Sequence, residues 1–142
     1  MRLKHIFTVL LCLTFVNVIQ AQKIKIKKGV IYVDDEKCLT TDGDPVNISF
    51  YDLEGEEIVF MKYLDDKRDG ENYMRVTFLN QEKSFTSKSV LFTKKMLIRR
   101  LLETKTIENC MLNEDKVDRF ILKYDEDIES SDINVNISID RD

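Results

Sequence analysis

The sequence predicts an α+β fold, in which a mostly antiparallel β-meander is followed by two C-terminal helices and an acidic tail with the pattern of a further strand. Apolar and polar residues alternate in short segments between residues 23 and 79, as in strands with one buried face. Turn-forming Gly, Asp, Asn and Pro separate many of these segments. From residue 97 onward, apolar residues recur with helical spacing.

Residues 1–21 are predicted to be a secretory signal peptide. Arg2 and Lys4 precede an apolar run from residue 6 to 19, and the small residue Ala21 lies at a suitable cleavage position. The apolar run has 14 residues, fewer than the about 20 that span a bilayer. We therefore expect export to the periplasm or the medium, with no transmembrane anchor after processing.

The strands are expected in the order of the alternating segments. The segment at 57–64 is apolar on both faces, which favours a central strand. The polar stretches between the alternating segments are predicted turns. Residues 40–45 (TTDGDP) and 65–72 (DDKRDGEN) are predicted loops. The predicted strands are 23–27, 30–33, 36–39, 46–51, 57–64, 73–79 and the last half of 84–92.

Two helices follow the strands. Thr93 is a suitable N-cap for the first, and Asn113 for the second. Each helix has an apolar stripe whose simplest role is core packing. The stripes are Leu97, Ile98, Leu101 and Leu102 in the first helix, and Val117, Phe120, Ile121 and Tyr124 in the second.

Removal of the signal peptide leaves 121 residues, which we interpret as one α+β domain at 22–124 and an acidic tail at 125–142. The tail contains seven acidic residues and one basic residue, and this accounts for the whole net charge of −6 of the processed chain. Residues 133–139 alternate as a strand does. They are expected to add to the sheet or to pair with the sheet edge of a partner.

The residue types that remain after processing argue against an enzyme. His5 is the only histidine in the sequence, and it leaves with the signal peptide, so Ser-His-Asp, Cys-His and His-rich zinc sites are excluded. The four glycines are scattered singly, so no glycine-rich phosphate loop is present. We predict no catalytic residue, no cofactor and no metal site.

Asp65 to Gly70 superficially resembles a calcium-binding loop. Lys67 stands where an oxygen ligand is needed, and the twelfth position holds Val76 in place of glutamate. We therefore interpret this segment as a hairpin loop.

Two cysteines, Cys38 and Cys110, remain after processing. In an oxidising compartment they could form a disulfide that closes a loop of about 72 residues. The other interpretation is that both are small buried thiols in separate parts of the core.

Six basic residues between positions 83 and 100 follow one another without an intervening acid. They are Lys83, Lys88, Lys94, Lys95, Arg99 and Arg100. One hypothesis is a patch for an anionic partner, covered in the free protein by the acidic tail. The other interpretation is an ordinary solvated surface. Nucleic acid is a poor candidate, because the chain is acidic and carries an export signal.

Several segments resemble small exported proteins of unknown function from Bacteroidetes bacteria. They are Ala21-Gln22 at the end of the signal, KIKIKKGVIYVDD, DLEGEEIVF and LNEDKVDRFILKY. The resemblance implies a periplasmic or secreted location, and it implies no catalytic residue and no ligand.

We expect an exported, non-catalytic binding or interaction protein, whose partner is another protein or an envelope component. One alternative is a periplasmic carrier of small ligands, with an apolar pocket lined by Phe50, Phe60, Phe78 and Phe120. A second alternative is a small hydrolase that uses carboxylates.

Overall fold

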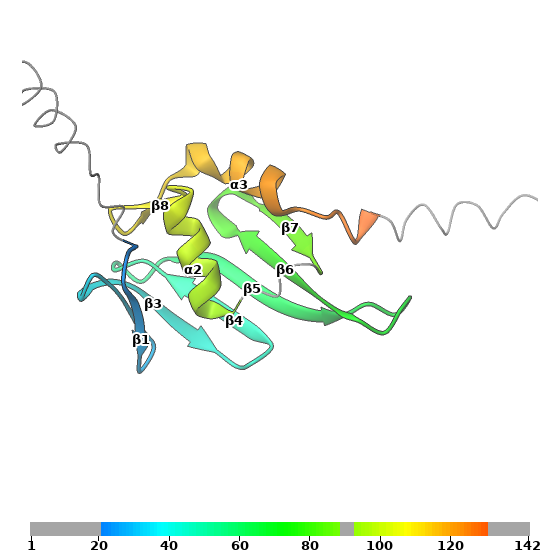
Figure 1. Cartoon of the computed structure of the whole chain (residues 1–142), viewed down its shortest axis with the longest axis horizontal. Coiled ribbons are helices and arrows are strands. Elements are labelled where there is room, and N and C mark those ends of the chain that lie inside the picture. Colours follow the sequence, from blue (N-terminus) through cyan, green and yellow to red (C-terminus); the bar gives the residue numbers. More distant parts are fainter. Residues whose placement is uncertain (1–20, 89–92, 131–142) are drawn as a thin grey trace, which may run out of the picture.

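The computed structural model describes residues 21–88 and 93–130, which form one antiparallel sheet partly covered by helices (Figure 1). Seven strands lie in the sheet in the order of the sequence, and each pairs with the next. The predicted β-meander is therefore confirmed. The strands are β1 (Ile24–Lys27), β2 (Val30–Val33), β3 (Glu36–Gly43), β4 (Asn47–Tyr51), β5 (Glu57–Asp65), β6 (Asn72–Phe78) and β7 (Lys83–Ser87).

The segment after the sheet contains helices and a small hairpin. Helix α2 contacts β1, and α3 contacts β7. The elements after the sheet are α2 (Lys94–Glu103), β8 (Ile107–Glu108), β9 (Met111–Leu112), the short 3-10 helix η3 (Glu114–Lys116) and α3 (Val117–Tyr124). A further 3-10 helix, η2 (Leu79–Gln81), connects β6 to β7. None of the helices in the described residues is long and apolar enough to cross a membrane.

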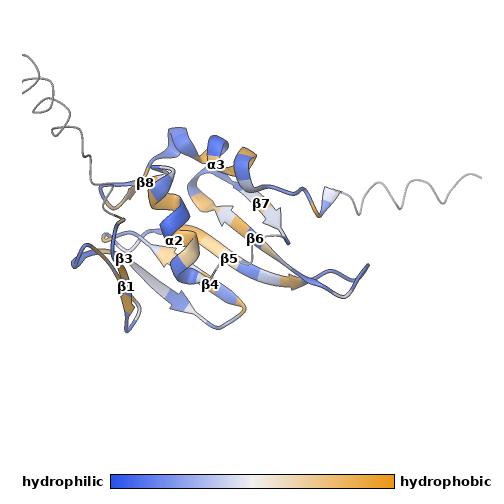
Figure 2. Ribbon diagram, viewed as in Figure 1, coloured by the Kyte–Doolittle hydropathy of each residue, from blue (hydrophilic) through white to orange (hydrophobic). Residues whose placement is uncertain are grey.

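The core lies between the helices and one face of the sheet. Ile48, Met61, Val76 and Phe85 are neighbours across four adjacent strands, and all four are buried. Phe120 of α3 packs edge-on against two rings of this layer, at centroid distances of 5.8 Å from Phe78 and 5.7 Å from Phe85. Figure 2 shows hydrophobic and hydrophilic residues alternating along these strands, as the sequence pattern predicts.

One predicted loop is wrong. Residues 40–43 belong to β3, where Thr40 pairs with Tyr51 and Thr41 pairs with Phe50. Thr40 and Thr41 are β-branched, and Thr41 is buried in the core face, so strand pairing outweighs the turn-forming residues that follow. The turn itself is shorter than predicted and is closed by Asp44, whose Oδ1 accepts hydrogen bonds from the backbone N of Val46 and Asn47 at 2.7 Å.

A strand, β7, occupies the first half of residues 84–92 and ends at Ser87. Phe85 packs against Phe120 of α3, and the carbonyl oxygen of Thr86 accepts a hydrogen bond from the backbone N of Glu126. The strand expected in the last half of 84–92 falls on residues that are largely not described. Residues 89–92 lie outside the described residues, as do the signal peptide up to residue 20 and the predicted strand at 133–139.

The two predicted helix caps have different outcomes. Thr93 caps α2, since its Oγ1 accepts a hydrogen bond from the backbone N of Met96 at 3.2 Å. Asn113 does not cap α3 with its side chain, which donates instead to Glu108 at 3.4 Å. The turn η3 intervenes, and α3 begins at Val117.

A disulfide joins the sheet to the small hairpin. Cys38 of β3 and Cys110 of the β8–β9 turn are bonded, with their Cα atoms 4.9 Å apart. Cys38 is buried, so the bond crosslinks the core to the segment between α2 and α3. Of the two interpretations of the cysteines, the structure supports the disulfide.

We expect the double substitution Cys38→Ala and Cys110→Ala to lower the free energy of unfolding by about 4 kcal/mol, because the bond closes a loop of 72 residues in the unfolded chain. Urea denaturation of the variant and of the oxidised protein measures the difference. Reduced wild-type protein should resemble the variant. Equal stability of oxidised and reduced protein would contradict this role of the disulfide.

Candidate anion-binding surface

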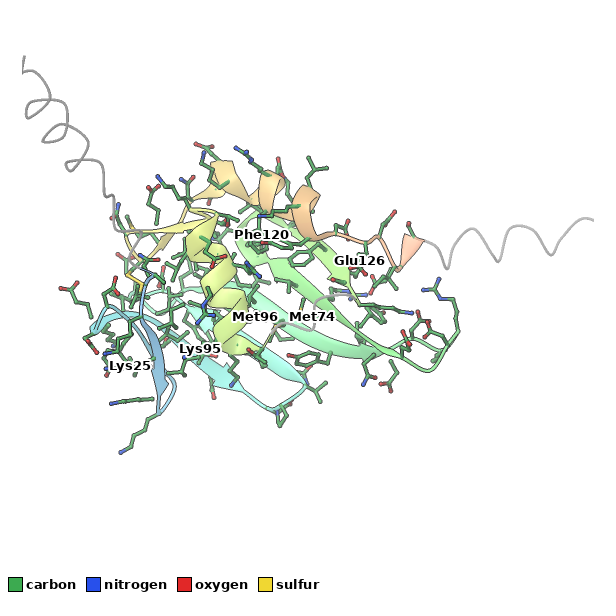
Figure 3. The ribbon with its side chains drawn as sticks, viewed as in Figure 1. Lys25, Met74, Lys95, Met96, Phe120 and Glu126 are labelled. Carbon is green, nitrogen blue, oxygen red and sulfur yellow. A yellow bond between two sulfur atoms is a disulfide. The ribbon has the colours of Figure 1, made fainter. Side chains whose placement is uncertain are left out.

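The fold divides the six basic residues of the predicted run. Lys83 forms an ion pair with Asp118 of α3 at 2.6 Å, and Arg100 pairs with Glu103 within α2 at 2.8 Å. Lys94, Lys95 and Arg99 are in α2, and none of them forms an ion pair within the described residues. Figure 3 shows Lys95 at the N-terminal end of this helix, well separated from Phe120. The run is therefore not one continuous patch.

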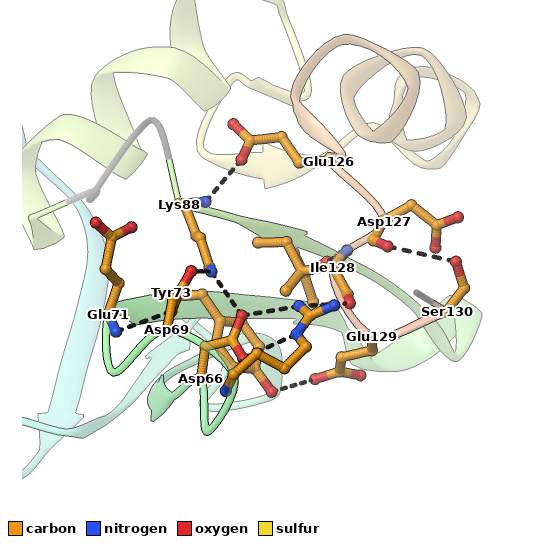
Figure 4. Close-up of polar contacts among 12 residues, drawn as sticks. Asp66, Asp69, Glu71, Tyr73, Lys88, Glu126, Asp127, Ile128, Glu129 and Ser130 are labelled. Carbon is orange, nitrogen blue, oxygen red and sulfur yellow. Dashed lines mark hydrogen bonds and ion pairs between the residues drawn. The ribbon is translucent and has the colours of Figure 1, made fainter. Parts of the chain in front are cut away.

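Lys88 belongs to a polar cluster at the β5–β6 loop (Figure 4). Its ammonium group pairs with Asp66 at 2.5 Å and also with Asp69. Asp66 is buried, and its two carboxylate oxygens accept hydrogen bonds from Arg68 Nε at 2.9 Å and Nη2 at 2.8 Å. Lys88 is thus held by acidic groups of the protein itself.

Asp66 is kept ionised by these two basic neighbours. Hydrogen bonds from Arg68, and then from Lys88, hold the pKa of the Asp66 carboxyl well below its ordinary value of 3.8. The same pairing raises the pKa of Lys88. Since both acceptor oxygens are occupied by cations, the loop that superficially resembles a calcium site is organised around internal ion pairs.

The first residues of the acidic tail pack on the sheet. The backbone N of Glu126 donates to the carbonyl oxygen of Thr86 at 2.8 Å, and the backbone N of Ile128 donates to Thr86 Oγ1 at 2.9 Å. Ile128 is buried, and its carbonyl oxygen accepts from Arg68 at 3.2 Å. Residues 125–130 are therefore part of the folded body.

Two carboxylates of this segment bind groups on the sheet. Glu129 accepts hydrogen bonds from Tyr73 Oη and Arg75 Nε, both at 2.9 Å. Glu126 accepts one from the backbone N of Lys88, also at 2.9 Å. The start of the tail thus meets the Lys88 end of the predicted run, but its closest side-chain cation is Arg75, which lies outside that run.

A second group of cations surrounds a groove between the end of α2 and α3. The groove has a volume of about 620 Å³, with Phe120 and Leu122 among its lining residues. Glu103 is the one acidic residue of the lining, and it already pairs with Arg100. We call this the basic groove, and its four cations are Lys105, Lys116, Arg119 and Lys123.

The cations of the basic groove lack a counter-ion among residues 21–88 and 93–130. None of the four forms an ion pair within the described residues. An adjoining hollow of about 570 Å³ shares Glu103 and Lys105 with the groove and is also lined by Arg99 and Glu108. Arg99, a member of the predicted run, therefore lies beside the basic groove.

Sequence reasoning missed the basic groove because acidic residues interrupt its cations along the chain. Glu108, Glu114, Asp115 and Asp118 lie between Lys105 and Arg119. One signal was available: Lys116, Arg119 and Lys123 are three and four positions apart, which places them on one side of a helical segment. Lys105 lies before the hairpin, and only the tertiary structure brings it to α3.

No cluster of three or more His, Cys, Asp or Glu side chains within residues 21–88 and 93–130 has the arrangement of a metal site. Comparisons with protein-family models, curated proteins and solved structures find no match for this chain. The resemblance to exported Bacteroidetes proteins therefore stays a prediction, and the function must be argued from the groove and its surroundings.

The lowered pKa of Asp66 predicts a loss of stability in acid. Because folding favours its carboxylate form, this contribution is present above the ordinary pKa of 3.8 and is lost as the pH falls below it, toward the pKa in the folded protein. We expect Asp66→Asn to be less stable than wild type at neutral pH and to lose less stability between about pH 5 and 2. Urea denaturation across this range measures both effects.

The exposed neighbour Asp65 provides the control for this experiment. Asp65→Asn should keep the pH dependence of the wild type. Identical pH profiles for Asp66→Asn and wild type would show that the Asp66 ion pairs contribute nothing to acid stability.

The packing of residues 125–130 predicts which C-terminal truncations lower the stability of the protein. A chain that ends at Tyr124 loses the buried side chain of Ile128 and should be destabilised by about 2 kcal/mol or more. A chain that ends at Ser130 keeps these contacts and should retain the stability of the full chain. Thermal and urea denaturation of both truncations test this, and equal stability of the two would contradict it.

Proposed function

We propose that this protein is an exported, non-catalytic binding protein that holds an anionic partner in the basic groove. The partner is another protein or an envelope component. The observation that carries the proposal is the convergence of four cations on one groove, none of them in an ion pair with another described residue. Like charges gathered on one surface repel each other, and an anionic partner relieves that repulsion.

The size and lining of the groove suit a binding role. Its volume of about 620 Å³ lies in the range of about 300–1,000 Å³ that is usual for binding sites of small ligands and side chains. Leu122 is 85% exposed and adds an apolar wall beside the cations. Arg99 of the predicted run lines the adjoining hollow, which shares Glu103 and Lys105 with the groove.

Export is supported by the disulfide and by the predicted signal peptide. A disulfide between Cys38 and Cys110 is typical of an oxidising compartment such as the periplasm or the extracellular medium. A protein in either place meets anionic envelope components and other exported proteins.

The packing of the phenylalanines does not favour a small-ligand carrier. Phe78 and Phe120 are in edge contact at 5.8 Å, and Phe50 is buried in the same layer. Phe60 is next to Val59 and Met61 in β5, and these two are buried on the core face, so Phe60 lies on the opposite face of the sheet. The four rings therefore do not surround one cavity.

The state of Asp66 does not favour a hydrolase that uses carboxylates. An enzyme of that class needs a general acid with a raised pKa. Asp66 is the buried carboxylate of the described residues, and Arg68 lowers its pKa. It is suited to an ion pair and not to proton donation near neutral pH.

Binding of a poly-L-glutamate probe tests the proposal. The wild-type protein should bind the probe at low salt and lose it at about 1 M salt, where the Debye length is about 3 Å. The groove variant, Lys116→Glu with Arg119→Glu, should bind at least about tenfold more weakly, because both cations line the groove. Fluorescence anisotropy of a labelled probe measures the dissociation constants.

The control variant, Lys37→Glu with Lys67→Glu, changes the net charge equally at exposed positions away from the groove. It should bind nearly as well as the wild type. An equal loss of affinity in both variants would show that binding of the probe depends on the net charge of the protein and not on the groove. A chain ending at Ser130, tested in the same way, shows whether residues 131–142 compete for the groove.

A further inference from the structure

Two adjoining hollows beside the basic groove have the opposite charge. Their volumes are about 380 and 460 Å³, and neither is lined by a lysine or an arginine. Both are lined by Met111 and Leu112 of β9. We call this region the acidic surface, and its acids are Asp52, Glu54, Glu108, Glu114 and Asp115.

The acidic surface also lacks internal counter-ions. None of its five acids forms an ion pair within the described residues. Met111 lies among them and is 63% exposed, the highest value among the large hydrophobic side chains of the described residues after Leu122. The two most exposed apolar side chains thus mark two surfaces of opposite charge.

The two surfaces lie next to each other. Glu114 lines the acidic hollows and Lys116 lines the basic groove, and both residues are in the single turn η3. The acidic surface and the basic groove share no lining residue, so they are neighbours on either side of η3.

We propose that the anionic partner of the basic groove is the acidic surface of a second copy of this chain. The inference rests on the proposed function, because it uses the same groove and names the partner that the groove holds. Charge complementarity supports it: within the part of the chain that the structure describes, the four cations and the five acids form no ion pairs, and an exposed apolar residue accompanies each set.

The adjacency of the two surfaces determines the symmetry of the dimer. In a two-fold dimer each contact occurs twice, so the groove of each copy meets the acidic surface of its partner. A two-fold axis close to η3 achieves this because the opposite charges lie on either side of that turn. The assembly closes as a dimer, and the contact is not repeated into a chain of copies.

Charge-reversal variants test the dimer by sedimentation velocity. Wild-type protein should dimerise at low salt, and the dissociation constant should rise at least about tenfold at about 1 M salt. The groove variant described above keeps two of the four groove cations beside two new acids, so its groove no longer attracts the acidic surface and the variant should be monomeric. The acidic-surface variant, Glu54→Lys with Asp115→Lys, keeps three acids beside two new bases, so its attraction to the groove is largely lost and it should also be monomeric.

Mixing the two variants distinguishes this interface from any other. In the mixed dimer, the unaltered groove of the acidic-surface variant meets the unaltered acidic surface of the groove variant, so one of the two contacts is restored and an equimolar mixture should form a heterodimer. Monomers in the mixture, or dimers that persist in both single variants, would overturn the proposed interface. Circular dichroism checks that the variants are folded; Glu54, Asp115 and Arg119 are exposed, and Lys116 is half-buried.

Failure of the dimer and failure of the proposed function give different results. The acidic-surface variant keeps the basic groove intact, so poly-L-glutamate should bind to it. Binding of this probe by a wild-type protein that stays monomeric at all concentrations would overturn the dimer and leave the groove's function standing. Loss of probe binding in wild type and in the acidic-surface variant would overturn the proposed function itself.

Discussion

The arrangement of the charged surfaces depends on the packing of Phe120 against Phe78 and Phe85. α3 has eight residues, too few for a helix that is stable by itself in water, so the buried rings hold it on the sheet. With Phe120 pointing inward, the helical repeat turns Arg119 and Leu122 outward into the groove. The same contact positions the chain that leaves α3, so that residues 125–130 reach β7.

The basic residues of this protein differ in whether the fold supplies a counter-ion. Lys88 is the clearest case of a paired cation, because a buried Asp66 holds it at 2.5 Å, and a partner would have to replace that contact. Lys105 and Arg119 have no such contact, so their field extends to the solvent and is available for recognition. The number of basic residues in a stretch of sequence is therefore a poor guide to where a partner binds. The decisive property is which cations the fold leaves unpaired.

Much of the fold could be predicted because strand alternation is a local property. Residues such as Ile48, Met61 and Val76 alternate with polar neighbours, and the structure pairs them in adjacent strands. The predicted loop at 40–45 was wrong because turn-forming residues there compete with packing. Thr41 is buried and pairs within β3, although turn-forming residues follow it. Part of the candidate site could also be predicted, since Lys116, Arg119 and Lys123 have helical spacing in the sequence. Lys105 could not, because its approach to α3 is a long-range contact.

The order of the strands, the position of the helical region and the two cysteines that could pair can all be predicted from the chain. These properties follow from periodicity, turn chemistry and residue type, which act over a few neighbouring positions. Three other features arise only in the folded protein: Cys38 and Cys110 meet, Asp66 neutralises Lys88, and the cations of α3 form no ion pair with another described residue although an acidic surface is close by. Ion pairs and disulfides depend on distances between segments, and folding the sheet under α2 and α3 sets those distances.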